Sequence, residues 1–264
     1  KDNWGTYFFL KDCDDQKVWS AAFQPTCVEG EHYEVSFAED RAKFTQDYHH
    51  ISSELEIFVS PESQAEVRRL TLTNRGFGVR EIEVTSYCEV VLNTQAADQA
   101  HPAFSNLFVQ TEYLKDISAI IATRRKRSQT DRNVWAAHVV ATDNHAIGDV
   151  QYETSRLNFL GRNREIRDAK AIFSKGQLTN TVGSVLDPIF SLRTRIRLQP
   201  GISTHITFST IVGESREEVL IQAENFHDFQ ADERASHLAW TQAQVKLHYL
   251  NIESEEAHLF QRLA

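Results

Sequence analysis

The chain has 264 residues, which is enough for one large domain and does not require a second. Its 37 acidic and 28 basic side chains give a formal net charge of −9, which argues against nucleic acid as a partner. No apolar run approaches the roughly eighteen residues of a membrane span, so we expect no membrane contact by this polypeptide.

From Trp4 to about Val212 the dominant hydrophobic period is two, which is typical of β-strands. Apolar residues alternate with glutamates in the stretch Ile82–Leu92 and with arginines in the stretch Leu192–Leu198. Each strand therefore has one apolar face. We expect the glutamate row and the arginine row to be exposed and to pair across neighbouring strands.

Turn sequences separate successive strands at Cys13–Gln16, Asn74–Gly78 and Gln199–Gly201, and we interpret all three as hairpin connections. Consecutive long antiparallel strands with one apolar face each predict two sheets packed face to face. The predicted fold class is mainly β.

Two further stretches between strands stand out. Ala96–Tyr113 carries a His-Pro pair, a phenylalanine and an asparagine where a plain connection needs only a turn. The basic run Arg124–Arg127 precedes a polar loop, and we interpret it as a solvated hairpin end, with an anion or partner contact as the alternative. Between Asn158 and Asp187 the composition indicates a short helix and a long loop.

After Gly213 the period changes to that of a helix. Ser215–Glu218 is a capping-box sequence and predicts a helix to about Phe226. A second helix is predicted from about Asp232 to Leu250, and its apolar residues cover more than half of its circumference. One sandwich surface cannot cover so wide an arc. We divide the chain into a β-domain, residues 1–213, and a helical linker, residues 214–264.

Residue patterns for catalysis or metal binding are missing from the sequence. The eleven histidines show no metal-binding spacing, and the adjacent pair His49 and His50 is expected to point to opposite faces of a strand. His237 and His248 lie on the polar arc of the long helix. The three cysteines form no CxxC pair, which fits a reducing compartment. We predict no metal, no cofactor and no catalytic residue.

Several stretches in unbroken order resemble a known family. They include DNWGTYFFLKD from Asp2, VWSAAFQPT from Val18, AHPAFSNLF from Ala100 and AWTQAQVKL from Ala239. Together they resemble the cyclic β-1,2-glucan synthases of bacterial carbohydrate metabolism, in the part that belongs to glycoside hydrolase family 94. The likeness covers nearly the whole chain.

The resemblance implies the family's N-terminal β-sandwich, the supersandwich type also seen in galactose mutarotases, followed by linker helices that lead to an (α/α)6 barrel. In such proteins the barrel carries the catalytic carboxylate and the site for inorganic phosphate, and a separate membrane-embedded glycosyltransferase builds the glucan. The barrel's motifs are absent from this chain. By resemblance, the chain is an excised piece on the cytoplasmic side of an inner-membrane protein.

The resemblance also suggests a role for the stretch Ala96–Tyr113. In related phosphorylases, sandwich loops reach toward the mouth of the barrel, so His101, Pro102, Phe104 and Asn106 are candidates for a sugar contact or an interdomain contact. The rigid His101–Pro102 pair, next to the ring of Phe104 and the amide of Asn106, would offer a sugar a stacking face and directional hydrogen bonds. The alternative is a loop that is folded onto its own sandwich and anchored by Phe104.

Three functions follow as hypotheses. The first is a non-catalytic module that binds β-glucan and positions it for the barrel. The second is a purely structural or dimerising domain of the same enzyme. The third is an aldose epimerase, which needs a histidine acid and a carboxylate base at one pocket; His138 is the nominated histidine.

Overall fold

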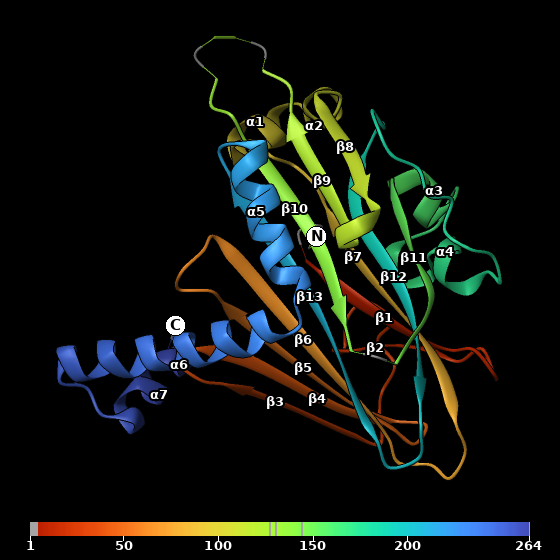
Figure 1. Cartoon of the computed structure of the whole chain (residues 1–264), viewed down its shortest axis with the longest axis vertical. Coiled ribbons are helices and arrows are strands. Elements are labelled where there is room, and N and C mark those ends of the chain that lie inside the picture. Colours follow the sequence, from red (N-terminus) through yellow and green to blue (C-terminus); the bar gives the residue numbers. More distant parts are fainter. Residues whose placement is uncertain (1–4, 127, 130, 144, 264) are drawn as a thin grey trace.

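The computed structural model describes residues 5–126, 128–129, 131–143 and 145–263. Two antiparallel sheets make up most of the molecule, as Figure 1 shows, and they confirm the predicted supersandwich. The larger sheet has eight strands in the order β3 (His32–Phe37), β4 (Arg41–Tyr48), β5 (Ile51–Val59), β6 (Ala65–Asn74), β13 (Ser203–Gly213), β10 (Trp135–Thr142), β9 (Ala119–Arg124) and β8 (Val109–Leu114). The smaller sheet has five, in the order β11 (Ala146–Ser155), β12 (Pro188–Leu198), β7 (Arg80–Glu89), β1 (Tyr7–Asp12) and β2 (Val18–Ser20).

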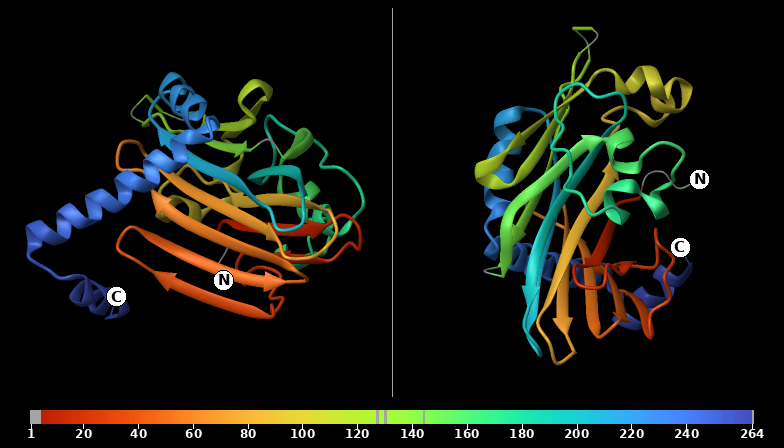
Figure 2. Two further views of the ribbon diagram at one scale, coloured as in Figure 1. Left: turned by 60° about the horizontal axis from the view of Figure 1, so that its bottom comes forward. Right: turned by 90° about the vertical axis from the view of Figure 1, so that its right-hand side faces the viewer.

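The main core lies between the two sheets, where the apolar faces of the strands meet. Leu70 and Phe208 of the larger sheet and Val84 and Ile196 of the smaller one are fully or almost fully buried there. Because eight strands face five, the larger sheet extends past the smaller one at β3 and β4, which Figure 2 shows from two further sides. That end of the apolar face is therefore incompletely covered.

Helices pack on the outer faces of both sheets. Helix α5 (Arg216–His227) lies on the larger sheet and buries Val219, Ala223 and Phe226 against it. On the smaller sheet, α3 (Arg156–Leu160), the 3-10 turn η2 (Ile166–Asp168) and α4 (Lys170–Phe173) form a further cluster around Phe159. The remaining elements are α1 (Gln95–Ala100), α2 (Pro102–Asn106), the 3-10 turn η1 (Lys115–Ile117), α6 (Gln230–Leu250) and α7 (Ser254–Leu263). The expected short helix and long loop between Asn158 and Asp187 thus correspond to α3, η2, α4 and the irregular segment after them.

Two of the three predicted hairpins are instead crossings between the sheets. The turn after Cys13 does join the paired strands β1 and β2, but Asn74–Gly78 joins β6 to β7 and Gln199–Gly201 joins β12 to β13, each pair split between sheets. The side-chain amide of the fully buried Asn74 donates to the carbonyl oxygens of Gly78 and Leu198, at 2.8 and 3.1 Å. It holds the two crossings together. Turn chemistry predicts a reversal of the chain but does not specify which sheet the next strand joins.

The predicted pairing of glutamates with arginines is present on β7 and β12. Arg195 Nη2 lies 2.6 Å from Glu83 Oε1, and Arg197 Nη2 lies 2.7 Å from Glu81 Oε1. Arg193 was expected in the same exposed row, and this expectation is wrong. It is buried beneath α4, donating to Thr85 Oγ1 at 2.9 Å and to a backbone carbonyl of α4.

His49 and His50 do not lie in a strand, which corrects the expectation that they point to opposite faces of one. They form the two-residue turn between β4 and β5, with φ angles of 53° and 63°. Two consecutive residues with positive φ match the twist of a tight hairpin, and this geometry tolerates polar side chains better than branched ones.

The C-terminal helices follow the predicted boundaries closely. Ser215 Oγ accepts from the Glu218 amide at 3.1 Å, as a capping box requires, but the Glu218 carboxylate accepts from the Glu214 amide and not from Ser215. Helix α6 starts on the larger sheet and then leaves the sandwich (Figure 1). Because α5 is packed on the sheet, it belongs to the same compact body as the strands; the division of the chain at residue 213 stays a prediction.

Candidate functional site

The stretch Ala96–Tyr113 forms α1, α2 and most of β8 at one end of the larger sheet. His101 lies between the two short helices and is exposed. Pro102 begins α2, and its side chain lies outside the described residues. Phe104 is 49% exposed, and Asn106 ends α2. The four predicted site residues therefore share one small helical segment.

Residues that the sequence did not single out fix this segment to the sandwich. Ser105 is 3% exposed; its carbonyl oxygen accepts from Arg124 Nη1 at 2.7 Å, and its hydroxyl accepts from Asn93 Nδ2 at 2.9 Å. Asn106 Nδ2 donates to Asp187 Oδ1 at 3.1 Å, which ties α2 to the end of the loop before β12. Serine, asparagine and arginine are common in turns and on surfaces, so no local sequence pattern marks these contacts.

The basic run lies at the end of the β9–β10 hairpin, and Arg125 is exposed there as the interpretation of a solvated hairpin end expects, whereas Arg124 is partly buried and donates to the carbonyl of Ser105. The guanidinium carbons of both lie 5.5 Å from the centre of the Phe108 ring, on which they act as cation–π partners. Arg127 lies outside the described residues. The beginning of the run therefore holds the α1–α2 segment in place.

The segment is folded onto its own sandwich, as the alternative expects, but Phe104 is not its main anchor. Its ring meets that of Phe108 edge to face at 5.3 Å, and about half of its surface remains exposed. Ser105 and Phe108 supply the anchoring contacts, and Phe104 and Leu107, both about half exposed, face outward. The segment thus offers an apolar surface on a fixed backbone.

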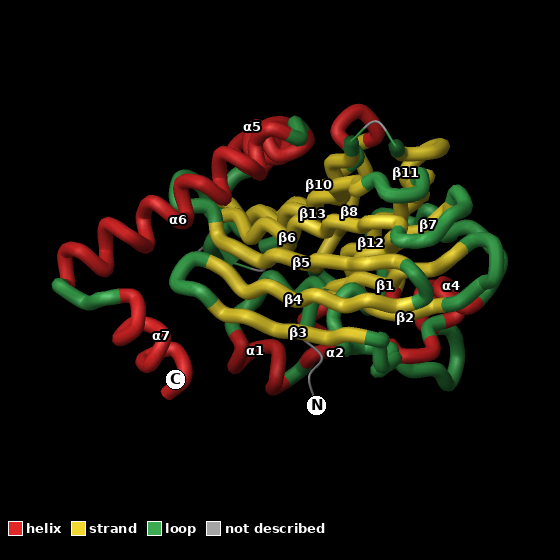
Figure 3. The backbone as a smooth tube through the Cα atoms, turned by 90° about the horizontal axis from the view of Figure 1, so that it is seen from below, coloured by secondary structure: helices red, strands yellow, loops and turns green. Residues whose placement is uncertain are grey.

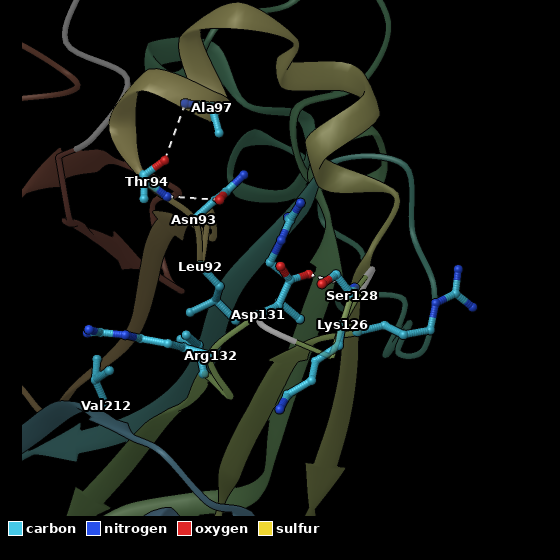
Figure 4. Close-up of a pocket in the computed structure, with 12 residues that line it drawn as sticks. Leu92, Asn93, Thr94, Ala97, Lys126, Ser128, Asp131, Arg132 and Val212 are labelled. Atoms are coloured by element: carbon cyan, nitrogen blue, oxygen red, sulfur yellow. Dashed lines mark hydrogen bonds between the residues drawn. The ribbon is translucent and has the colours of Figure 1, made fainter.

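A cleft of about 800 Å³ adjoins the segment, and Figure 4 shows the side chains that line it. Its walls come from the loop before α1 and from α1 itself, from the β9–β10 hairpin and from β13: Leu92, Asn93, Thr94, Ala97, Arg124, Arg125, Lys126, Ser128, Asp131, Arg132, Val134 and Val212. The volume is within the range of small-ligand sites. Thr94 Oγ1 accepts from the Ala97 amide, and Asp131 Oδ2 accepts from the Ser128 amide at 3.1 Å.

The chemistry of the cleft is suited to binding. Its described lining contains four basic side chains, one carboxylate, an amide and hydroxyls, next to the apolar Leu92 and Val212. Such a surface donates hydrogen bonds to hydroxyl-rich or anionic ligands and packs against the apolar face of a sugar. Two carboxylates flanking a bond, which glycoside hydrolysis uses, are not both present among these lining residues.

His138 was nominated as an epimerase acid, and the structure contradicts this role. It is 1% exposed, its ring is stacked 5.8 Å from both Phe190 and Phe208, and burial lowers its pKa to about 3. Its ring nitrogens are hydrogen-bonded to Ser86 Oγ at 2.9 Å and to Thr210 Oγ1 at 3.0 Å. A neutral, enclosed imidazole with hydroxyl partners is a core residue.

Two of the three cysteines are likewise poorly suited to chemistry. Burial raises the pKa of the Cys88 thiol to about 12 and that of Cys13 to about 11, so both stay protonated near neutral pH. Across the described part of the chain, no group of three or more His, Cys, Asp or Glu side chains is placed to hold a metal ion. No helix in that part is both long enough and apolar enough to cross a membrane.

Two sheets packed face to face, with helices on their outer surfaces, define a β-supersandwich domain. The family model described as the glycosyl hydrolase 94 supersandwich domain matches residues 1–229, and the chain belongs to this family. The match confirms the resemblance seen in the sequence.

The whole chain is similar to the cyclic beta-(1,2)-glucan synthase NdvB of Rhizobium meliloti (strain 1021), with 36% identity over 263 residues. It covers 100% of this chain and 9% of that protein. Solabiose phosphorylase of Paenibacillus borealis is 25% identical over 78% of this chain and 25% of its own length. The chain therefore spans only a tenth to a quarter of the curated relatives it matches.

Among solved structures, a bacterial glucoamylase complexed with acarbose superposes with a TM-score of 0.53 and 10% identity, covering 90% of this chain and 31% of that one. At this identity the likeness concerns the fold alone.

Proposed function

We propose that this chain is the non-catalytic accessory supersandwich of a bacterial cyclic β-1,2-glucan synthase and that it positions β-linked glucan for a neighbouring barrel. The similarity to NdvB over the full chain and the membership in the glycosyl hydrolase 94 family support the proposal. The partners it implies are a β-glucan and an (α/α)6 barrel of the parent protein. Inorganic phosphate would act in that barrel and not in this chain, and the parent protein would lie at the cytoplasmic side of the inner membrane.

One observation carries the glucan-positioning role: the half-exposed Phe104 sits on a segment whose backbone is held by the buried Ser105. A sugar stacks best on an aromatic ring that is already fixed, because less conformational entropy is lost on binding. His101 lies beside it, and the basic cleft adjoins the same segment. A glucan chain would cross Phe104 and place its hydroxyls against the cleft.

The test uses the full-length parent enzyme with Phe104→Ala and, separately, His101→Ala. Loss of a stacking contact of about 1 kcal/mol predicts a KM for glucan that rises about fivefold with Phe104→Ala, while kcat stays within about a factor of two. The matched control is Phe77→Ala, because Phe77 is fully exposed in the turn between β6 and β7. An unchanged KM in both site variants would refute the sugar contact.

A purely structural role is the second candidate, and the surface of α6 favours it. Beyond Ala239 this helix leaves the sheet, and Trp240, Val245 and Tyr249 are 50%, 62% and 87% exposed. An apolar surface of this kind fits an interdomain contact. In this reading, Trp240→Ser lowers the unfolding temperature of the parent enzyme without changing kcat per folded molecule, and the Phe104 variant has no effect on KM.

A further inference from the structure

The outer face of the smaller sheet has a recess of its own, beside the edge strand β11. The regular pairing of β11 with β12 is interrupted there, and Gly148–Val150 stand opposite the single Thr194 of β12. Gly148 has a φ of 73°, which lets the extra residues bow away from the sheet. Bulges of this kind are common next to binding sites, because they redirect side chains and open space beside a strand.

Residues 174–187, the irregular segment between α4 and β12, form the opposite wall of the recess. The amide of Leu178 donates to Gln151 Oε1 at 3.0 Å. Asn180 holds Tyr152 at both of its backbone groups: the amide of Asn180 donates to the carbonyl of Tyr152, and Asn180 Oδ1 accepts from the amide of Tyr152, both at 3.0 Å. The segment is therefore tied to β11, and a cavity of about 410 Å³ remains between it and the bulge.

Charged side chains of β7 and β12 line the recess on the side of the sheet. Arg193 is 3% exposed, and its guanidinium donates to Thr85 Oγ1 at 2.9 Å and to the carbonyl of Ala171 at 2.6 Å. Arg195 Nη2 donates to Glu83 Oε1 at 2.6 Å. These groups are held in place before any ligand binds, which lowers the entropy lost on binding.

The amide side chains of the recess have unused hydrogen-bonding groups. Gln151 and Asn180 use their oxygens to hold backbone amides, and their NH2 groups make no hydrogen bond within the part of the chain that the structure describes. The side chain of Gln177 makes none to any described residue. Because a carboxamide is planar, fixing its oxygen also restricts the direction of its NH2 group. The recess therefore presents preorganised donors.

The charges and the apolar residues of the lining indicate the class of ligand. Two guanidinium groups stand against two carboxylates, those of Glu83 and Asp149, so an anion such as phosphate gains no net attraction. An apolar ligand is disfavoured because it would desolvate these polar groups. Ile147 and Val150 add a small aliphatic surface. Amides, carboxylates and guanidinium groups around such a surface suit a ring with many hydroxyls, since each hydroxyl both donates and accepts.

We propose that this recess is a second saccharide site, with room for about two sugar rings of a neutral glucan. It shares no lining residue with the cleft beside α1. Figure 3 shows α4, which borders the recess, on the opposite side of the molecule from α6 and α7. The site therefore lies away from the surface of α6 that fits an interdomain contact. The identity of the sugar as a β-linked glucan rests on the proposed function.

The experiment follows the backbone amides of the 264-residue chain by NMR during titration with linear β-1,2-linked gluco-oligosaccharides. Binding in the recess should shift the amides of Leu178 and Tyr152, because the side chains that they contact donate to the sugar, and that of Gly148 in the bulge. Gln177→Ala should weaken binding about fivefold and leave the fold unchanged, because this exposed side chain bonds only to the ligand. The matched control is Gln199→Ala, at an exposed glutamine in the crossing from β12 to β13, which should bind as the wild type does.

A parallel titration with inorganic phosphate tests the class of ligand, and we expect it to leave the amides of the recess unshifted. The proposal is overturned if millimolar oligosaccharide does not shift these amides, if phosphate shifts them in its place, or if Gln177→Ala binds as tightly as the wild type. Shifts confined to Phe104 and its neighbours would overturn this site and support the proposed glucan contact. Shifts confined to the recess would support this site and leave Phe104 without a contact, so the two proposals fail separately.

Discussion

The buried His138 predicts a specific dependence of stability on pH. In the folded chain, burial between Phe190 and Phe208 lowers its pKa to about 3 from the ordinary 6.5, with a smaller contribution from the positive charge of Arg68. In the unfolded chain the imidazole binds a proton below about pH 6.5. Between these two values the unfolded state holds more protons, so the free energy of unfolding rises with pH. The contribution of His138 is complete above pH 6.5 and is lost as pH falls toward 3.

The expected magnitude follows from this window. Each pH unit below 6.5 costs about 1.4 kcal/mol, so the loss at pH 5 is about 2 kcal/mol relative to pH 8. His138→Gln removes the titrating group and keeps a side chain that can hydrogen-bond to a neighbouring hydroxyl. We expect the variant to be less stable than the wild type at pH 8 by about 1 to 3 kcal/mol, because one buried hydroxyl partner is left unsatisfied. At pH 5 the difference in free energy of unfolding between the wild type and the variant should be smaller by about 2 kcal/mol.

Urea unfolding followed by circular dichroism at pH 8, 7, 6 and 5 measures the gap directly. His237→Gln is the control for the loss of one histidine, because His237 is exposed on α6. Carboxylates titrate equally in both proteins and cancel in the comparison. A gap that is the same at pH 8 and pH 5 would show that His138 is not held neutral, and the reasoning from its burial would fail.

Three further changes probe other parts of the structure. Glu56→Ala removes the carboxylate that accepts from both Arg41 and Arg69, whose hydrogen bonds outweigh the effect of burial and lower its pKa. The free energy of unfolding in urea should fall by about 3 kcal/mol at neutral pH, and by less as the pH drops through the titration of Glu56. A loss below about 0.5 kcal/mol would contradict a structural role for Glu56 and its two arginines. Arg124→Gln should speed amide hydrogen exchange in α1 and α2 about tenfold and leave the sheets unchanged; equal exchange in both proteins would mean that the segment is held by other contacts. Gly201→Ala places a side chain at φ 74° in the crossing from β12 to β13, and the free energy of unfolding should fall by about 1 kcal/mol in thermal unfolding. An unchanged stability would mean that the turn adopts another conformation.

Much of the local structure was predictable from residue order alone. The period of two on β7 and β12, the match of glutamates with arginines, and the Ser215 start of α5 all depend on residues that lie close together in the sequence or repeat regularly. The unbroken series of family-like stretches identified the supersandwich family before any packing was known. The wide apolar arc of α6 was also evident from helical periodicity.

The tertiary structure decided the contacts between residues far apart in the chain. Periodicity indicates which face of a strand is apolar but not which strand will cover it. The turns at Asn74 and Gln199 were therefore predicted to be hairpins, although they connect strands of different sheets. In the same way, only folding brings Arg124 to the carbonyl of Ser105 and encloses His138 between two rings. Such contacts form when separate strands pack, and their free energy depends on burial that no short stretch of sequence specifies.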